Sequence, residues 1–241
     1  MAYGSQPRWT DRSAATLTDV DVGLRDYMLR IYNYMASALA LTGIVAWVAA
    51  AGGRDSFIAH IYHTPLMWLI ILAPLGLVMV LSYGLNRLSL TAAQAIFWGY
   101  SALMGLSMST IFLVYTGESI ARVFFITAGT FAAMSLYGYT TRRDLSRFGS
   151  FLFMGLIGIV IASVVNIFVA STMLYFIVSV VGVLVFVGLT AYDTQTIKEM
   201  YYEGDGYEIA GKKSIMGALR LYLDFINLFM MLLRLMGSAR D

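Results

Sequence analysis

The sequence has 241 residues, of which 59% are hydrophobic and only 12% are charged, and its mean hydropathy is +0.75. A soluble domain of this size could not bury so much apolar surface, so lipid must solvate most of the chain. The net charge of +2 comes without a dense basic stripe, which argues against a nucleic-acid partner. The absence of cysteine excludes disulfides, thiol catalysis and thiolate metal sites.

The first 27 residues are polar and lack the apolar stretch of a signal peptide, so the first hydrophobic helix should itself direct insertion. We expect a polar N-terminal tail over residues 1–27 and one membrane domain over 28–237. Seven apolar windows follow, and a membrane span needs roughly 20 such residues. The sequence therefore predicts an all-α polytopic membrane protein with seven transmembrane helices. Their expected positions are 28–50, 66–85, 91–115, 119–138, 149–170, 173–192 and 214–236.

The basic residues of the loops predict the orientation, because Lys and Arg are more frequent on the cytoplasmic side. If the N-terminus is cytoplasmic, the cytoplasmic side carries a clear excess of Lys and Arg residues. The cytoplasmic set is then Arg8, Arg12, Arg25, Arg30, Arg87, Arg142, Arg143, Arg147, Lys198, Lys212 and Lys213, against Arg54, Arg122, Arg234 and Arg240 outside. We therefore expect a cytoplasmic N-terminus, and seven crossings would place the C-terminal end outside.

The last window is less hydrophobic than the others and carries Arg220, Asp224 and Asn227 on one helical face. An aspartate deep in a span costs roughly 2.5–3.5 kcal/mol on insertion scales, so Asp224 should face protein rather than lipid. We therefore expect this seventh helix at the centre of the bundle, surrounded by the other six. Two alternatives stay open. Arg220 and Asp224 could simply neutralise each other along the helix, or residues 221–236 could form an interfacial or re-entrant segment.

Asp193 follows the sixth window, and hydropathy alone is equally compatible with an ordinary charged helix end at the interface. The predicted topology adds a second interpretation, because Asp193, Asp224 and Arg87 would all lie in the cytoplasmic half of the bundle. Two carboxylates close together in a medium of low dielectric constant cannot both be ionised cheaply. A nearby arginine would favour the charged form. Such a group could act as a proton-controlled latch.

Other polar residues receive more ordinary interpretations. Asn166, in the fifth window, is expected to hydrogen-bond a neighbouring helix. His60 and His63 could bind a metal in the first outer loop, but no carboxylate pair lies near them in the sequence. Tyr32, with the tryptophans at span edges, is expected to belong to the interfacial belt or to pack between helices.

The segments AYDTQTIKEMY and LYLDFINLF resemble the Bax inhibitor-1 family in its bacterial branch, and the resemblance extends over residues 25–237. It implies six helices around a central seventh, and a pH-sensitive cation leak that conducts chiefly calcium. The gate would be an aspartate dyad, Asp193 and Asp224, which could also contact calcium in transit. Arg87 would hold the gate closed, and Arg220, Asn227 and Asn166 could tune it.

The resemblance also implies a cell inner membrane location and no organic cofactor. The expected partners are the lipid bilayer, calcium ions and, for a bacterial member, a membrane-bound AAA protease. The chain departs from its relatives in two places. The second window reads LAPLGLVMV and lacks the glutamate that some bacterial relatives carry, and Arg220 stands where relatives often have a small or neutral residue.

Two other function classes remain to be weighed. An intramembrane aspartyl protease would need a Gly-x-Gly before the second aspartate, but Leu221, Tyr222 and Leu223 precede Asp224, and no Pro-Ala-Leu motif is present. No HExxH, GxSxG or P-loop motif occurs either, so we do not expect an enzyme. A protein that regulates a membrane protease or a cell-death pathway without conducting ions stays an alternative.

Overall fold

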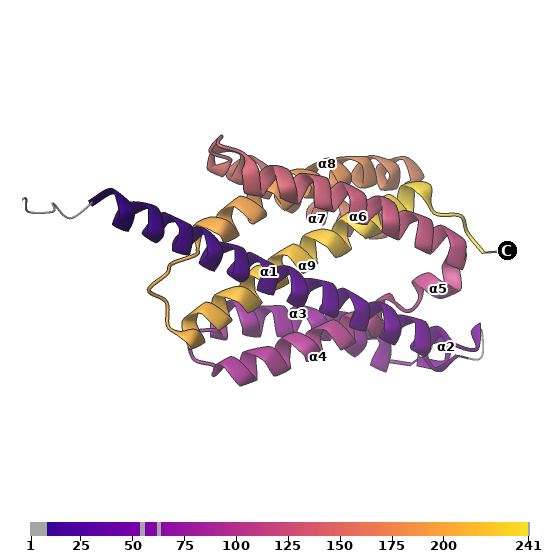
Figure 1. The fold of residues 1–241 in the computed structure, drawn as a ribbon. Coiled ribbons are helices and arrows are strands. Elements are labelled where there is room, and N and C mark those ends of the chain that lie inside the picture. The colour runs from indigo at the N-terminus through magenta and orange to yellow at the C-terminus, as the bar shows by residue number, and fades with distance from the viewer. Residues whose placement is uncertain (1–8, 54–55, 62–63, 241) are drawn as a thin grey trace, which may run out of the picture.

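The computed structural model describes residues 9–53, 56–61 and 64–240, with side chains described from residue 22 onward. These residues form a bundle of helices (Figure 1). Seven helical segments are long and apolar enough to cross a membrane, which confirms the predicted fold class. They are α1 (Trp9–Ala50), α3 (Leu66–Gly84), α4 (Leu90–Met108) with its extension α5 (Ile111–Val114), α6 (Gly117–Thr140), α7 (Ser146–Val169), α8 (Thr172–Glu199) and α9 (Tyr207–Met236); α2 (Phe57–Ile61) is a short outer helix.

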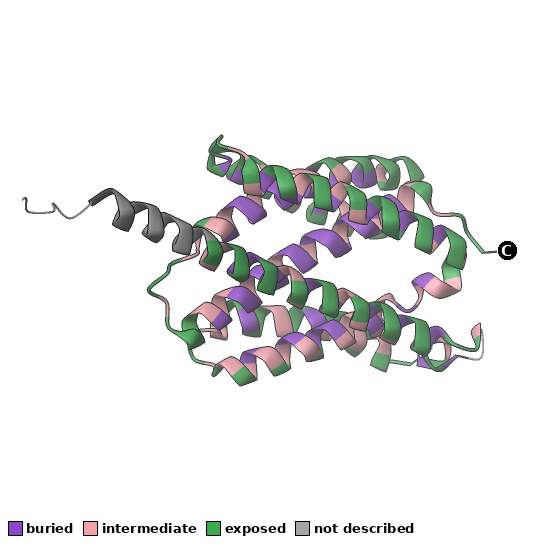
Figure 2. Ribbon diagram, viewed as in Figure 1, coloured by how far each residue is buried: buried purple, intermediate pink, exposed green. Residues whose placement is uncertain are grey.

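Helix α9 is the core of the molecule. In its apolar window 72% of the residues are buried, whereas the other six spans have between 6% and 33% buried. Helices α1, α4, α6 and α8 pack directly against it, while α3 packs mainly on α4 and α7 packs on α8. Figure 1 shows α9 in yellow crossing between α6, α7 and α8 on one side and α3 and α4 on the other, and Figure 2 shows its buried residues. The predicted central seventh helix is confirmed, but only four spans form its main contacts.

The two helices that carry the aspartates are longer than hydropathy indicated. Helix α8 continues to Glu199, so Asp193 lies inside a helix instead of ending one. Helix α9 already begins at Tyr207 and runs unbroken to Met236, which is incompatible with a short re-entrant segment. The connection between them is short, and Lys213 Nζ of α9 donates to its Asp205 Oδ2 at 2.5 Å and to the Met200 carbonyl at 3.0 Å. Hydropathy marks where lipid contact ends, whereas backbone hydrogen bonds continue into water.

The first span begins earlier than the sequence predicted. Helix α1 begins at Trp9, and its candidate membrane segment begins at Val22, ahead of the expected boundary at residue 28. The division into a polar tail and a membrane domain therefore stays a prediction.

At the opposite end of α9, the chain pairs with the connection between α5 and α6. The Thr116 N–H donates to the Ser238 carbonyl at 3.1 Å, and the Arg240 N–H donates to the Val114 carbonyl at 2.8 Å. These backbone hydrogen bonds fix the end of the central helix to its surroundings.

Candidate functional site: the aspartate pair

Asp193 of α8 and Asp224 of α9, the aspartate pair, come together in the interior of the bundle. Their carboxyl groups lie within hydrogen-bonding range of each other. Asp224 is only 4% exposed, and its Oδ2 receives no hydrogen bond from any donor in the described chain. Two carboxyl groups in such contact cannot both carry a charge cheaply, so the arrangement is suited to holding one shared proton.

Arg220 is the cation that meets this pair. Its Nη1 lies 3.7 Å from Asp193 Oδ1, which is an ion pair but is beyond the range of a hydrogen bond. The guanidinium side chain is 41% exposed, and the Asp193 side chain is 16% exposed. Arg220 therefore pairs with the aspartate of the neighbouring helix, and a self-neutralising pair within α9 does not describe the arrangement.

Arg87 lies elsewhere. It is exposed in the turn between α3 and α4, and none of the described acidic side chains forms an ion pair with it. The sequence correctly places Arg87 after the second span, but depth along a span does not fix the position around the bundle. Helix α3 packs mainly on α4, and α9 is not among its main neighbours. The structure therefore does not bring Arg87 to the aspartate pair, and a locking role for it stays a prediction.

The two asparagines make local hydrogen bonds. Asn227 Nδ2 donates to the Leu223 carbonyl of its own helix at 2.8 Å. Asn166 Oδ1 accepts from the Ser171 N–H at 2.9 Å and so closes the turn between α7 and α8. The expected bond from Asn166 across to another helix is replaced by this turn, where Ala170 adopts a left-handed conformation.

The histidine pair is not supported as a metal site. His60 is exposed, and its Nδ1 lies 3.0 Å from the Ser56 carbonyl, while His63 lies outside the described residues. Within the described ranges, no three side chains of His, Cys, Asp or Glu gather closely enough to hold a metal ion. Among the described residues, no third such side chain joins the aspartate pair to form a metal-binding group.

Glycines of two neighbouring helices position the segment of α8 that carries Asp193. A Cβ atom at Gly138 of α6 would overlap the backbone carbonyl of Ala191, and one at Gly149 of α7 would lie 2.6 Å from the Tyr192 ring. Both helices can therefore approach α8 so closely only because these residues have no side chain. The backbone just before Asp193 is consequently clamped from two sides.

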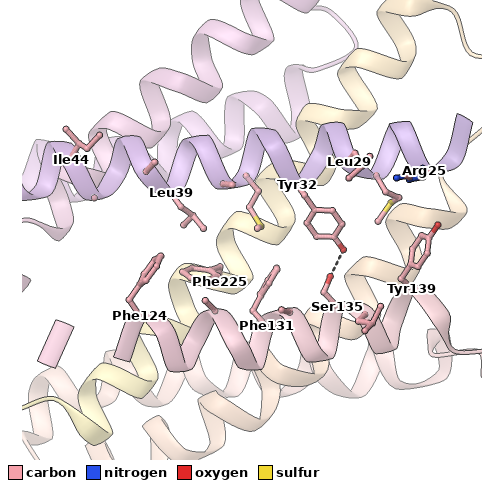
Figure 3. Close-up of a pocket in the computed structure, with 18 residues that line it drawn as sticks. Arg25, Leu29, Tyr32, Leu39, Ile44, Phe124, Phe131, Ser135, Tyr139 and Phe225 are labelled. Atoms are coloured by element: carbon pink, nitrogen blue, oxygen red, sulfur yellow. Dashed lines mark hydrogen bonds between the residues drawn. The ribbon is translucent and has the colours of Figure 1, made fainter. Parts of the chain in front are cut away.

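A chain of hydroxyl groups links the aspartate region to α1. Tyr32 Oη lies 2.5 Å from Ser135 Oγ of α6 (Figure 3), and Ser135 Oγ lies 2.9 Å from Thr194 Oγ1 of α8. Thr194 in turn donates to the Thr190 carbonyl at 2.7 Å. Tyr32 therefore packs inside the bundle and does not belong to the interfacial belt. Ser135 and Thr194 could not be singled out from the sequence, because hydroxyl residues are common in spans and no spacing marks these two.

A second hydroxyl network holds α9 to α1 and α4. Thr42 Oγ1 donates to the Ser101 carbonyl at 2.8 Å and lies 2.7 Å from Tyr222 Oη, two residues before Asp224. All of these groups are buried. Helix α9 is thus bonded to α1 directly, whereas α8 is linked to α1 through Ser135 of α6.

Comparison with known proteins agrees with this architecture. The family model described as "Inhibitor of apoptosis-promoting Bax1" matches residues 24–241. The chain is 52% identical over 222 residues to the inner membrane protein YbhL of Escherichia coli K12, covering 90% of this chain and 94% of that protein. It is 51% identical over 225 residues to an uncharacterized protein of Rickettsia prowazekii, covering 92% and 93%. An uncharacterized membrane protein of Streptococcus pyogenes is 37% identical over 221 residues, covering 91% and 96%. The chain therefore belongs to the Bax inhibitor-1 family and has bacterial relatives at about half identity.

Proposed function

We propose that the protein is a pH-sensitive cation leak of the cell inner membrane, with calcium as its permeant ion and the aspartate pair as its gate. The observation that carries this proposal is the contact between the two carboxyl groups, one of them almost fully buried in the central helix. Inserting an ionisable group into a span costs free energy, so such groups usually pair with other polar groups or face an ion pathway. The Escherichia coli relative is named as an inner membrane protein, which supports the location.

The gating mechanism follows from charge. When the pair holds one proton, it carries one negative charge, and Arg220 attracts it across the contact between α8 and α9. A second proton would neutralise the pair and replace the charge-assisted hydrogen bond between the two carboxyl groups, which Arg220 stabilises, by a weaker neutral one. The contact between α8 and α9 would then weaken, and acidification would favour opening.

Calcium would pass the pair without being held there. Calcium ions take six to eight oxygen ligands in stable sites. Two carboxyl groups supply at most four oxygens, so water or carbonyl groups would complete the shell of an ion in transit. In this proposal the N-terminus is cytoplasmic, and the aspartate pair lies in the cytoplasmic half of the membrane.

Calcium flux into sealed liposomes that contain only the purified full chain tests the proposal. Between about pH 8 and about pH 5, we expect the flux to rise as the pH falls. Asp193→Asn and Asp224→Asn should each shift this pH dependence, and the double variant should abolish it, because only the double variant has no carboxyl group of the pair left to gain a proton. Asp26→Asn, which changes an exposed aspartate of α1, is the matched control and should behave like the unchanged protein.

Two results would contradict the proposal in different ways. Absence of flux at every pH would show that the protein is not a leak, and would favour a regulator of a partner such as a membrane-bound AAA protease. Flux with unchanged pH dependence in both asparagine variants would keep the leak but exclude the aspartate pair as its gate.

A further inference from the structure

A large apolar cavity lies between α1 and α6, outside the aspartate pair (Figure 3). Its volume of about 890 Å³ is in the range of cavities that hold organic ligands. Phe131 of α6 and Phe225 of α9 contribute to its lining, and small residues such as Ala36 and Ala132 widen it from both sides. An apolar cavity of this size needs an apolar occupant, because water would find few hydrogen-bonding partners in it.

The bilayer is the source of that occupant. Both walls of the cavity belong to membrane spans, and residues at its edges are exposed, including Leu29, Ile44 and Leu136. Two of its three hydroxyl groups, those of Tyr32 and Ser135, are bonded to each other. The rest of the lining is almost entirely hydrocarbon, which suits a lipid acyl chain.

One end of the cavity is cationic. Figure 3 shows Arg25 of α1 and Tyr139 of α6 at this end. Lys198 of α8 stacks on the Tyr139 ring, with Nζ 5.0 Å from the ring centroid, and donates to the Tyr139 carbonyl at 2.9 Å. No acidic side chain in the described part of the chain forms an ion pair with Arg25. Guanidinium groups bind phosphate strongly, and basic groups at a membrane surface attract anionic lipids.

We propose that this cavity binds one anionic phospholipid of the bilayer. Its phosphate would lie at Arg25 and Tyr139, with Lys198 adding positive charge, and one acyl chain would run between α1 and α6 as far as Phe225. Since Phe225 is the neighbour of Asp224 in α9, the bound lipid would contact the central helix beside the aspartate pair. The proposal does not depend on ion conduction.

Lipid titration of the purified full chain in detergent, followed by native mass spectrometry, tests the headgroup site. The probes are phosphatidylglycerol and phosphatidylcholine with identical acyl chains. We expect one tightly bound phosphatidylglycerol, preferred about tenfold over phosphatidylcholine, and Arg25→Gln should remove this preference. Arg30→Gln, which removes an exposed charge of α1 that does not line the cavity, should preserve it. Equal loss in both variants, or no preference in the unchanged protein, would overturn the proposal.

Photo-crosslinking tests the acyl-chain site independently. Phosphatidylglycerol with a photoreactive acyl chain should label α1 and α6 in the unchanged protein. Ala132→Phe should reduce this labelling several-fold by filling the cavity, whereas Ala133→Phe, at an exposed position that does not line the cavity, should leave it intact. Thermal unfolding of both variants checks that each is folded. Equal labelling in the two variants, or labelling confined to other helices, would overturn the proposal.

Discussion

Arg220 decides how firmly the aspartate pair holds its negative charge. It lies one helical turn before Asp224 on α9, and its guanidinium reaches Asp193 on α8 at 3.7 Å. The contact is partly exposed and is longer than a hydrogen bond, so its energy is modest. A modest attraction is appropriate for a switch, because protonation of the pair can then overcome it.

Arg220→Ser should therefore raise the pH at which the leak opens. Without the cation the ionised form of the pair is less stable, so it should gain its second proton at a higher pH. From the energy of partly exposed ion pairs, we expect a shift of roughly half a pH unit. The flux assay in liposomes, repeated across the pH range, measures this shift.

Arg87→Ser is the control for that experiment. Arg87 is exposed and has no ion pair with the described acids, so its loss should leave the pH profile unchanged. An unchanged profile in Arg220→Ser together with a shifted profile in Arg87→Ser would contradict the arrangement seen here. It would restore the locking role that the family resemblance assigns to Arg87.

The residues of the site differ in how far the sequence could reveal them. Placing Asp224 in lipid would cost free energy, so hydropathy alone singles it out. Asp193 needed the predicted topology and the family resemblance, because it follows an apolar window and so looks like a helix end. The partner of Arg220 could not be predicted, since a helical face shows which residues share a side but does not identify the helix opposite. The hydroxyl groups of Ser135 and Thr194 depend entirely on the packing of α6 against α8.

At the scale of helices, close packing around α8 holds the aspartate pair in place. Helix α6 approaches α8 at Gly138, where any side chain would meet the Ala191 carbonyl two residues before Asp193. The sequence predicted the seven spans and the central one correctly, because both signals are local. They are the length of each apolar segment and the free-energy cost of placing Asp224 in lipid. It could not predict which four spans contact α9, because outer and inner helices are apolar alike in lipid.

Gly138→Ala should destabilise the protein by about 1–3 kcal/mol, because the added methyl group must push α6 and α8 apart. Gly129→Ala is the matched control on the same helix, since a Cβ there would meet no atom within 4 Å. It should be neutral or slightly stabilising, as alanine favours helix more than glycine does. Thermal unfolding in detergent compares the two. Equal melting temperatures would show that the contact at Gly138 is not a constraint.

At the scale of the whole molecule, seven crossings by the candidate spans would place the two ends of the described chain on opposite sides of the membrane. The excess of Lys and Arg on one side predicts which side is cytoplasmic. A reporter that is active only outside the cytoplasm, such as alkaline phosphatase, should therefore be active when fused after residue 240. A fluorescent protein that matures only in the cytoplasm should be dark at the same position. The reverse result would invert the predicted orientation.

The position of α9 in the sequence has a consequence for how the protein is made. Because this helix is both the most buried span and the last of the seven in sequence, it leaves the ribosome after the spans that surround it. Until then the hydroxyl group of Thr42 on α1 lacks its α9 partner, Tyr222. Insertion of a helix with a central carboxylate would then complete the bundle in one late step. A ribosome that stops before Tyr207 would release six inserted helices that have no core to assemble around.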